Sequence, residues 1–307
     1  MVRVAAITMA VRPCLDERTK QGYPSSITET LEMNLKKASG LVSQAAKKKS
    51  SMVCLPEYFA TGYPFLSSIA KTELTVLLRN LMRQSRDRIR ESLREIAIAH
   101  HVFLIGGSFI EEEGGRIFNT CEIVSPQGKV VGRYRKNIPF WSELYYLTSG
   151  KSIPVFETPY CKVGISICGE ISASPEIFKI LALKGAKIIF CPTLITGIFL
   201  GDERNFGEGE RSMQETLCVR ARDGAVYVAF SCGLAPVKNS KGKPIDYLIR
   251  SMIISPQGKI LSATSKPDSV AVQDLDIDSL NLIKQSYTAG EPLVSKLEAT
   301  ILELYGP

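Results

Sequence analysis

A cysteine in the setting of a nucleophile stands at the end of a short apolar run. The run 164–168 is followed at once by Gly169 and by the carboxylate of Glu170. Such a run predicts a buried strand that delivers a thiol to its C-terminal edge. Gly169 allows a sharp backbone turn and lets another molecule approach its N–H closely. We therefore take Cys168 as the candidate nucleophile, against the alternative of a small, buried packing residue.

A thiol becomes a nucleophilic thiolate beside a base or a positive field. Histidine is the usual base, and the chain has two, His100 and His101, adjacent at the end of a predicted helix. A histidine base also needs a third group to orient it, and helix capping is the alternative role for this pair. A buried carboxylate is the other candidate, because desolvation raises its pKa until it can accept the thiol proton. A neighbouring ammonium would stabilise both the thiolate and the oxyanion of a tetrahedral intermediate.

Glu57 and Lys136 are the side chains that best match these two roles. Glu57 follows a predicted buried strand at 52–55, and Lys136 follows a predicted strand at 129–134. With Cys168, both stand at C-terminal strand ends, the edge at which α/β sheets favour ligand sites. Taken singly, Glu57 has the alternative role of a surface carboxylate in front of a helix, and Lys136 that of one residue in a basic surface run.

The elements that position these residues are predicted to form two similar halves. Apolar periodicity and turn residues indicate strand, helix, strand, helix and then three strands in each half. In the first half these segments are 2–9, 27–48, 52–55, 72–100, 102–109, 118–125 and 129–134; in the second they are 162–168, 175–184, 187–191, 211–223, 225–231, 248–255 and 259–263, with a closing strand at 269–276.

Two sequence echoes support a repeat of this order. The stretch 123–129 (IVSPQGK) returns at 253–259 as IISPQGK, and 53–56 (VCLP) returns at 189–192 as IFCP. Self-similarity of this kind indicates a repeated structural unit. Two half-sheets, each covered by helices on one side, can bury their remaining apolar faces against each other. The expected fold class is therefore α/β, as a four-layer α-β-β-α sandwich built from two similar halves.

With these residues assembled, the chain resembles the nitrilase superfamily of carbon–nitrogen hydrolases, whose members use a Glu-Lys-Cys triad on an α-β-β-α sandwich. The matching stretches are 55–57 (LPE) with Gly62 and Tyr63 behind it, 132–136 (GRYRK) and 163–168 (VGISIC). Each motif is weak alone, but all three stand in order and on matching strands. The resemblance implies a carbon–nitrogen hydrolase domain at 1–280 and leaves 281–307 as a C-terminal tail.

The resemblance implies a role for each matching residue. Glu57 would be general base and acid, Cys168 the nucleophile, and Lys136 with the Gly169 N–H the site of the oxyanion. The acyl group would pass to the thiol as a thioester, ammonia or an amine would leave, and water would then release a carboxylic acid. Glu143, the best match to a second glutamate of the family, would orient the substrate or the triad. No metal or organic cofactor is implied.

The chain departs from the family pattern around its predicted pocket. After the cysteine, relatives usually carry an aromatic residue and an aspartate, where this chain has Gly169 and Glu170. The stretch 137–141 (NIPFW) replaces a histidine-containing element that commonly follows the lysine. These changes bear on the substrate more than on the reaction. Aromatic side chains are the candidates for a substrate wall, with core packing as their alternative role: Tyr58, Trp141, Tyr145 and Tyr146.

Several activities share the expected chemistry. Hydrolysis of amides or N-carbamoyl compounds, hydrolysis of nitriles and N-acyl transfer all begin with the same attack by the thiol. A non-catalytic interaction module of the same fold is the alternative outside catalysis. The glycine-rich segment 196–210 has no periodicity and is predicted to be a long loop near the site, either a lid or a surface excursion.

Composition argues against several other classes of protein. The 307 residues are 45% hydrophobic and 22% charged, which suits a sizeable core. No apolar run reaches the length of about 18 residues that a membrane span needs, and we see no signal-peptide pattern, so we expect a soluble, cytoplasmic protein. The net charge of +7 is dispersed, which disfavours nucleic acid as a partner. Eight cysteines form no C-x-x-C pair and no Cys/His cluster of zinc spacing, so neither a disulfide framework nor a metal site is expected.

Apolar residues continue beyond the last predicted strand. They recur as Leu280, Leu282, Ile283, Leu293, Val294, Leu297, Ile301, Leu302 and Leu304. Apolar surface of this kind needs a partner. We therefore expect the tail to pack on a partner subunit, and the resemblance implies a homodimer or a larger homo-oligomer. The other expected partner is a small amide, ureido or nitrile substrate.

Overall fold

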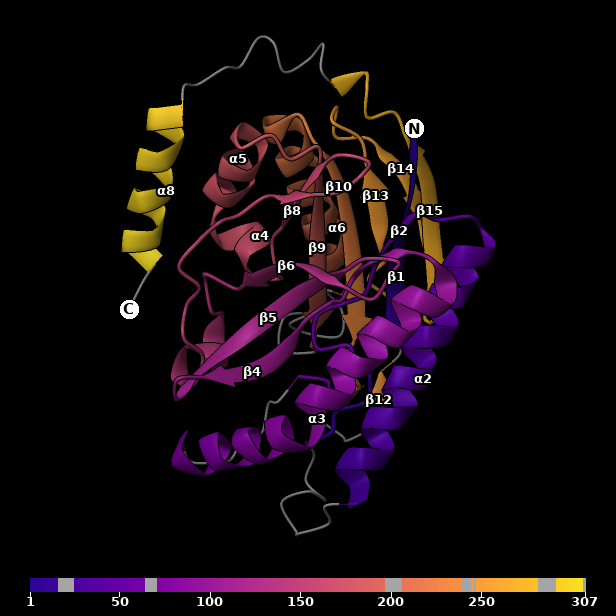
Figure 1. Ribbon diagram of the computed structural model, residues 1–307, viewed down its shortest axis with the longest axis vertical. Helices are drawn as coiled ribbons and strands as arrows, with labels where there is room; N and C mark the ends of the chain where they lie inside the picture. The colour runs from indigo at the N-terminus through magenta and orange to yellow at the C-terminus, as the bar shows by residue number, and fades with distance from the viewer. Residues whose placement is uncertain are drawn as a thin grey trace.

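The computed structural model describes residues 1–15, 25–63, 71–196, 206–238, 244–245, 247–280 and 291–305. These residues form a mixed α/β fold in which helices cover a curled sheet (Figure 1). The first half contains β1 (Val2–Ala10), α2 (Ser25–Lys47), β2 (Met52–Cys54), α3 (Lys71–His100), β3 (Phe103–Ile105), β4 (Phe109–Glu113), β5 (Arg116–Val124), β6 (Val130–Arg135) and the 3₁₀ helix η1 (Trp141–Tyr145). The rest contains β7 (Phe156–Glu157), β8 (Lys162–Ile165), α4 (Glu170–Ala173), α5 (Pro175–Leu183), β9 (Ile188–Ile195), α6 (Phe206–Gly224), β10 (Tyr227–Leu234), β11 (Val237–Lys238), β12 (Pro244–Ile245), β13 (Met252–Ile254), β14 (Ile260–Ala263), β15 (Ser269–Leu275) and α8 (Glu291–Tyr305).

Strand β1 lies at the centre of the sheet. It pairs in parallel with β2, and it pairs antiparallel with β15 along most of its length. Its pairing with β10 is confined to Met9 and Ala10, opposite Gly233 and Leu234. The path through the sheet is β4-β5-β3-β2-β1-β10-β9-β8-β7. The end of β1 therefore joins two half-sheets. One contains β1 to β6 and β15, and the other contains β7 to β10, β13 and β14.

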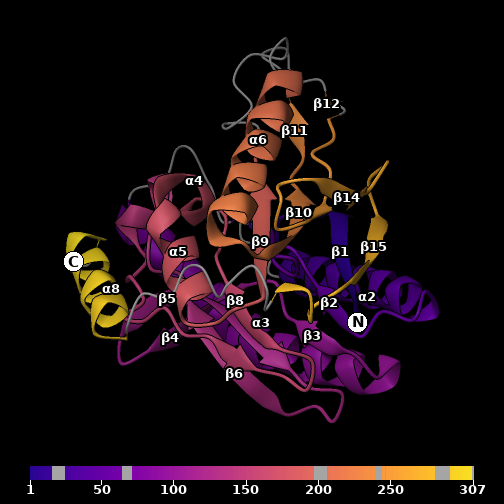
Figure 2. The ribbon, with the colours of Figure 1, turned by 90° about the horizontal axis from the view of Figure 1, so that it is seen from above.

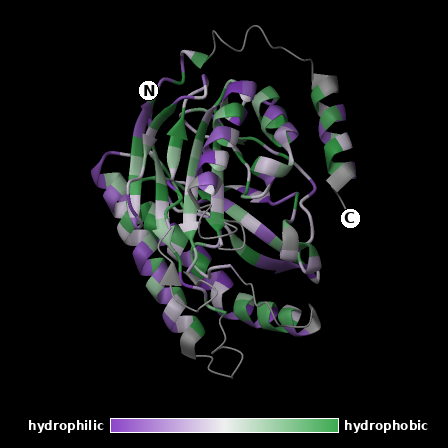
Figure 3. Ribbon diagram, turned by 180° about the vertical axis from the view of Figure 1, so that it is seen from behind, coloured by the Kyte–Doolittle hydropathy of each residue, from purple (hydrophilic) through white to green (hydrophobic). Residues whose placement is uncertain are grey.

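Buried apolar side chains gather in three clusters. One lies between the first half-sheet and helices α2 and α3, and includes Leu35 and Leu78. Another lies between the second half-sheet and helices α5 and α6, and includes Phe178. The third joins residues of both half-sheets, such as Val4 and Phe190. The two helix pairs lie apart in both views (Figures 1 and 2), and Figure 3 shows hydrophobic residues concentrated along the strands between them.

The two echoed turns, at 125–129 and 255–259, have the same geometry. In each turn the serine N–H donates to the lysine carbonyl at 2.8 Å, and the serine hydroxyl accepts from the lysine N–H at 3.3 Å. Gly128 and Gly258 both have a φ of 75°, a left-handed conformation that glycine adopts without strain. Each turn also follows a register shift at the same place in its strand pair. The repeat that the sequence indicated is thus matched in the backbone.

Several element boundaries differ from the predictions. The strand predicted at 102–109 is broken into β3 and β4, because Gly107 turns the chain with a φ of 60°. The strand predicted at 162–168 ends at Ile165, so Cys168 lies beyond it. Helix α6 begins at Phe206, earlier than predicted, and residues 197–205 of the predicted loop lie outside the described residues. Short elements that the prediction lacked are η1, α4, β7, β11 and β12.

Helix α8 packs against α5 of the same chain. Ile301 joins the apolar cluster beneath α5, and Val294 is also buried. Lys184 forms an ion pair with Glu298, whose carboxylate also accepts from the Ile153 N–H at 2.9 Å. Val294 and Ile301 of this helix are therefore buried within the chain, and the contact of the tail with a partner subunit stays a prediction.

Two general features of the described residues bear on function. None of their helices combines the length and the apolar character that crossing a bilayer would require. The same residues include no group of three or more His, Cys, Asp or Glu side chains arranged to hold a metal ion.

Candidate active site

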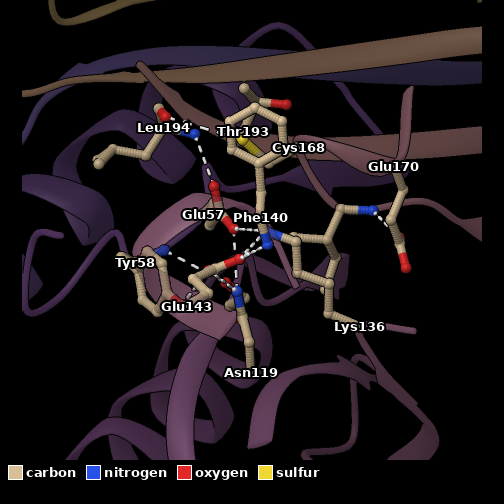
Figure 4. A network of polar contacts seen from close by, with 12 residues as sticks. Glu57, Tyr58, Asn119, Lys136, Phe140, Glu143, Cys168, Glu170, Thr193 and Leu194 are labelled. Carbon is tan, nitrogen blue, oxygen red and sulfur yellow. Dashed lines mark hydrogen bonds and ion pairs between the residues drawn. The ribbon is translucent and has the colours of Figure 1, made fainter. Parts of the chain in front are cut away.

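Lys136 lies between two carboxylates beyond the strand ends (Figure 4). Its Nζ is 3.0 Å from Oε1 of Glu57 and 2.7 Å from Oε2 of Glu143. Each of the three side chains exposes at most 2% of its surface. Glu57 follows β2, Lys136 follows β6 and Glu143 lies in η1, so three elements converge on one buried ion cluster.

Contacts from both half-sheets fix Glu57 beyond β2. Its Oε1 accepts from the Asn119 side-chain amide of β5 at 2.9 Å, and its Oε2 accepts from the Leu194 N–H of β9 at 3.1 Å. Behind it, Gly107 approaches Pro56 so closely that a Cβ at this position would lie 2.1 Å from the Pro56 carbonyl oxygen. Only glycine allows this approach, which sets the path of the chain into Glu57.

Cys168 occupies a sharp turn between β8 and α4. Its φ of 50° is a left-handed conformation, which is strained for a residue other than glycine. The Cys168 N–H donates to the Pro192 carbonyl at 2.9 Å, and the Cys168 carbonyl accepts from the Ile171 N–H at 3.0 Å. Cys168 as a whole residue is partly exposed, and its thiol lies 3.8 Å from the Leu194 carbonyl oxygen and hydrogen-bonds to Glu57. The structure therefore brings the predicted base, cation and thiol together.

Burial and neighbouring charges set the protonation states of this cluster. Burial raises the pKa of Glu57, and the Lys136 ammonium partly offsets that effect. Burial alone would lower the pKa of Lys136, but Glu143, Glu57 and Cys168 together hold it well above its ordinary value. Burial also raises the pKa of the Cys168 thiol; Glu57 adds to the rise and Lys136 opposes it. The lysine thus keeps its charge, and the thiol keeps its proton until a base removes it.

Glu143 is held against Lys136 by donors on all sides. Its Oε1 accepts from the Tyr58 hydroxyl at 2.6 Å and from the Asn119 amide at 3.3 Å. Its Oε2 accepts from the Phe140 N–H at 2.8 Å as well as from the lysine. A carboxylate bonded in this way has one orientation, so it fixes the lysine ammonium in turn.

Gly169 packs directly against Phe140. A Cβ at position 169 would lie 2.7 Å from Cδ2 of Phe140 and 2.9 Å from its Cβ. In Figure 4 the Phe140 side chain extends toward Cys168. The Gly169 N–H meets no backbone acceptor in the part of the chain that the structure describes. A donor and an aromatic ring therefore stand next to the thiol.

The predicted wall residues fall in different places. Tyr58 is buried and contacts Glu143 rather than open space. Tyr146 is buried, whereas Tyr145 is 59% exposed and forms no hydrogen bond with the cluster among the described residues. The backbone of Trp141 begins η1, and its side chain lies outside the described residues. Contact of these aromatic residues with a substrate stays a prediction.

Sequence reasoning missed the supporting roles of Asn119, Phe140 and Glu170. Asn119 links Glu57 to Glu143, and the signal for it was a single amide in the middle of a predicted buried strand. Glu170 is wholly buried and accepts hydrogen bonds around the cysteine turn. Its signal was a carboxylate directly after the turn glycine.

Comparison with known sequences gives the family of the chain. Residues 3–285 match the family model described as carbon-nitrogen hydrolase. The omega-amidase NIT2 of Xenopus tropicalis is 30% identical over 261 residues, which cover 82% of this chain and 86% of that protein. The omega-amidase NIT2 of Mus musculus is 29% identical over the same length and coverage.

Solved structures share the fold. A carbon-nitrogen hydrolase from Helicobacter pylori G27 has a TM-score of 0.74 at 20% identity, covering 93% of this chain and 92% of that one. An amidase from Nesterenkonia sp. AN1, with acrylamide added at its active site cysteine, has a TM-score of 0.70 at 20% identity, covering 93% and 98%. On the family match and these relatives, the chain belongs to the carbon-nitrogen hydrolase family.

Proposed function

We propose that the chain hydrolyses the carbon–nitrogen bond of a small, non-peptide amide through a thioester on Cys168. The observation that carries this proposal is the buried contact among Glu57, Lys136 and Cys168, which joins a base, a cation and a thiol. A purely structural role gives no reason to bury an ammonium with two carboxylates beside a cysteine in a strained turn.

Acylation would begin with attack of the Cys168 sulfur on the amide carbon while Glu57 accepts the thiol proton. As the C–S bond forms, the carbonyl oxygen takes up an electron pair, and Lys136 with the Gly169 N–H stabilises this oxyanion. The carbonyl then re-forms and the C–N bond breaks. Glu57 returns the proton to the departing nitrogen, so ammonia or an amine leaves and a thioester remains.

Deacylation would use the same groups in reverse. Glu57 removes a proton from water, and the resulting hydroxide attacks the thioester carbon. The oxyanion forms again beside Lys136, the C–S bond breaks, and Glu57 gives its proton to the departing sulfur. The acid is released and the resting thiol is restored. Glu143 acts by holding Lys136 in place through both steps.

The relatives favour amides as the substrate class. Two of the similar proteins are omega-amidases, and a structural neighbour is an amidase modified at its active site cysteine. A primary amide that releases ammonia is therefore the first class to test. N-carbamoyl amino compounds, nitriles and acyl transfer to an amine remain the alternatives, since all begin with the same attack.

The family also suggests an architecture and a setting. We propose that the domain 1–280 is a four-layer α-β-β-α sandwich, because one apolar cluster lies between the half-sheets and the two others lie beneath helices. We further propose that the protein works as a homodimer or larger assembly in the cytoplasm, without a metal or an organic cofactor.

A panel of primary amides, ureido acids and nitriles, scored by ammonia release, tests the proposed activity. We expect release from amides with the natural chain. Because a positioned charged group contributes two to four orders of magnitude to the rate, Glu57→Gln, Lys136→Ala and Cys168→Ala should each lose at least about a thousandfold in kcat while staying folded. A folded Lys136→Ala variant with near-normal turnover would contradict the assignment.

The covalent step can be observed directly by mass spectrometry. Glu57→Gln, given an activated ester that needs little acid help for its leaving group, should accumulate one acyl group because deacylation slows more than acylation. Peptide mapping should place the acyl group on Cys168. The buried thiols of Cys54 and Cys191 provide the internal control, and an adduct on either of them would place the chemistry elsewhere.

A further inference from the structure

Glu170 is a buried carboxylate that the reaction steps do not use. Its side chain has no exposed surface. Its Oε2 accepts from the Ile167 N–H at 2.6 Å, and its Oε1 accepts from the Asn137 N–H at 2.6 Å and the Ile138 N–H at 3.2 Å. The Tyr134 hydroxyl donates to both oxygens, at 2.8 and 2.9 Å. Four donors surround it, so both of its oxygens accept hydrogen bonds from fixed groups.

These donors belong to the two backbone segments that carry the thiol and the ammonium. Ile167 immediately precedes Cys168, while Asn137 and Ile138 immediately follow Lys136. One carboxylate therefore ties the cysteine turn to the chain that leaves β6. In the sheet, these two segments are connected only through other strands.

Both segments need such a tie. The left-handed φ of Cys168 is kept only if surrounding contacts outweigh the strain, and the Ile167 N–H contact lies one residue before it. Lys136 directly follows the last residue of β6, and its carbonyl accepts from the Gly150 N–H at 2.8 Å. Beyond that point, Glu170 holds the next two N–H groups.

We propose that Glu170 is a positioning residue that sets the Cys168 sulfur relative to the Lys136 ammonium. The proposal rests on the proposed function of this site. Glu170 forms no hydrogen bond with the side chains of Glu57, Lys136 or Cys168 among the described residues, so it acts through the backbone. It would contribute to turnover by holding geometry, and very little to the binding of substrate.

Glu170→Gln and Glu170→Asp test this role. Glutamine keeps the length but directs an NH₂ group at donors, and aspartate keeps the charge but is too short to reach both segments. Because a displacement of about 1 Å at reacting groups can cost about a hundredfold, we expect kcat to fall by ten- to a hundredfold in both variants, with KM within about twofold. The two variants make the test independent of whether one of them fails to fold.

The rate at which iodoacetamide alkylates Cys168 gives a readout that needs no substrate recognition. We expect this rate to fall at least about fivefold in both variants, because a thiol displaced from Lys136 loses its positive field. The readout also separates the two proposals. If iodoacetamide alkylates Cys168 of the natural chain rapidly but the chain hydrolyses no amide, the proposed function fails. The alkylation rates of the Glu170 variants still decide the role of Glu170.

Glu122→Gln is the matched control. Glu122 is a carboxylate on β5 that is 1% exposed and lies away from the cysteine turn. It forms ion pairs with Arg90 of α3 and Arg133 of β6. We expect this variant to lose stability while keeping its kcat and its alkylation rate. The proposal is overturned if both Glu170 variants fold and turn over like the natural chain. It is equally overturned if their kcat falls no more than that of Glu122→Gln at equal loss of stability.

Discussion

Beside the Cys168 thiol, the Phe140 side chain fills the space that a side chain at position 169 would need. An alanine at 169 would place its Cβ 2.7 Å from the Phe140 ring, so the ring and its backbone must move. The Phe140 N–H donates to Glu143, which holds Lys136, so this movement reaches the ammonium. We expect Gly169→Ala to lower kcat by about tenfold or more and to cost about 1–3 kcal/mol of stability through overpacking.

Steady-state kinetics and chemical unfolding check this prediction. Gly40→Ala is the control, since a Cβ at Gly40 in α2 meets nothing within 4 Å. It should gain about 0.5–1 kcal/mol, as alanine favours a helix interior over glycine, and leave kcat unchanged. Phe140→Ala combined with Gly169→Ala should recover part of the stability lost in the single variant. A Gly169→Ala variant with normal kcat would show that the contact is unimportant.

Burial raises the pKa of Glu170 to about 7, although the Ile167 N–H, Lys136 and Tyr134 favour its charged form. A folded pKa above the ordinary value of 4.5 means that the folded state binds the proton more tightly than the unfolded state. Its contribution to stability is therefore full below about pH 4.5 and is lost progressively up to about pH 7. Lys136, Tyr134 and Cys191 also face this carboxylate; their raised pKa values keep them from titrating in that range.

Glutamine at position 170 does not titrate, so comparing the natural chain with Glu170→Gln isolates the contribution of Glu170 titration to stability. Between about pH 4 and pH 8, the free energy of unfolding of the natural chain should fall relative to that of Glu170→Gln by about 3 kcal/mol, because the pKa of Glu170 is about 7 in the folded chain against 4.5 in the unfolded chain. Urea unfolding at intervals of pH measures it. A difference that is constant with pH would mean that Glu170 has an ordinary pKa.

Among single residues, the sequence predicted those whose chemistry is visible in their type. Glu57, Lys136 and Cys168 each follow an apolar strand, and the structure brings them together as expected. The roles of Asn119 and Phe140 could not be read in the same way, because each depends on which segments become neighbours in the fold. An amide becomes a link between two carboxylates only once the fold brings β5 within reach of Glu57 and of η1.

At the scale of elements, the echoed turns allow a comparison within one molecule. Gly128 and Gly258 have the same φ, so alanine at either position carries the same backbone strain, about 1–2 kcal/mol. Their surroundings differ. A Cβ at 258 would lie 2.7 Å from the Cys218 carbonyl, which is backbone, whereas a Cβ at 128 would meet the end of the Ile98 side chain at the same distance. We expect Gly258→Ala to cost more stability than Gly128→Ala, as measured by urea unfolding, with the reverse order contradicting the argument.

The period of apolar residues predicted the long helices and the central strands, but it did not predict where strands break. Residues 102–109 form one apolar run, yet Gly107 divides it with a φ of 60°, at a position where Pro56 leaves no room for a Cβ. The run that ends in Cys168 also continues past the end of β8. The N–H groups of Ser166 and Cys168 still bond to β9, whereas the Ile167 N–H bonds to Glu170. Both departures occur beside the site and are set by tertiary contacts.

At the scale of the whole molecule, the tail was expected to meet a partner subunit because of its apolar residues. In the structure, Val294 and Ile301 are buried on the same chain, and Lys184 pairs with Glu298. The apolar pattern predicts a covering surface for the tail, and α5, more than a hundred residues away in sequence, provides part of it within the chain. Contact of the tail with a partner subunit stays a prediction.

Deletion of residues 281–307 separates the two roles of the tail. It would uncover the face of α5 on which α8 packs, and burial of Val294 and Ile301 contributes about 1.5–3 kcal/mol each, so we expect stability to fall by a few kcal/mol. Ammonia release should persist at permissive temperature, because no residue of α8 contacts Glu57, Lys136 or Cys168 among the described residues. Because Val294 and Ile301 are buried within their own chain, light scattering should give the same number of subunits before and after deletion. A smaller number would instead mean that the tail joins subunits, while a monomer in both forms would contradict the proposed homodimer.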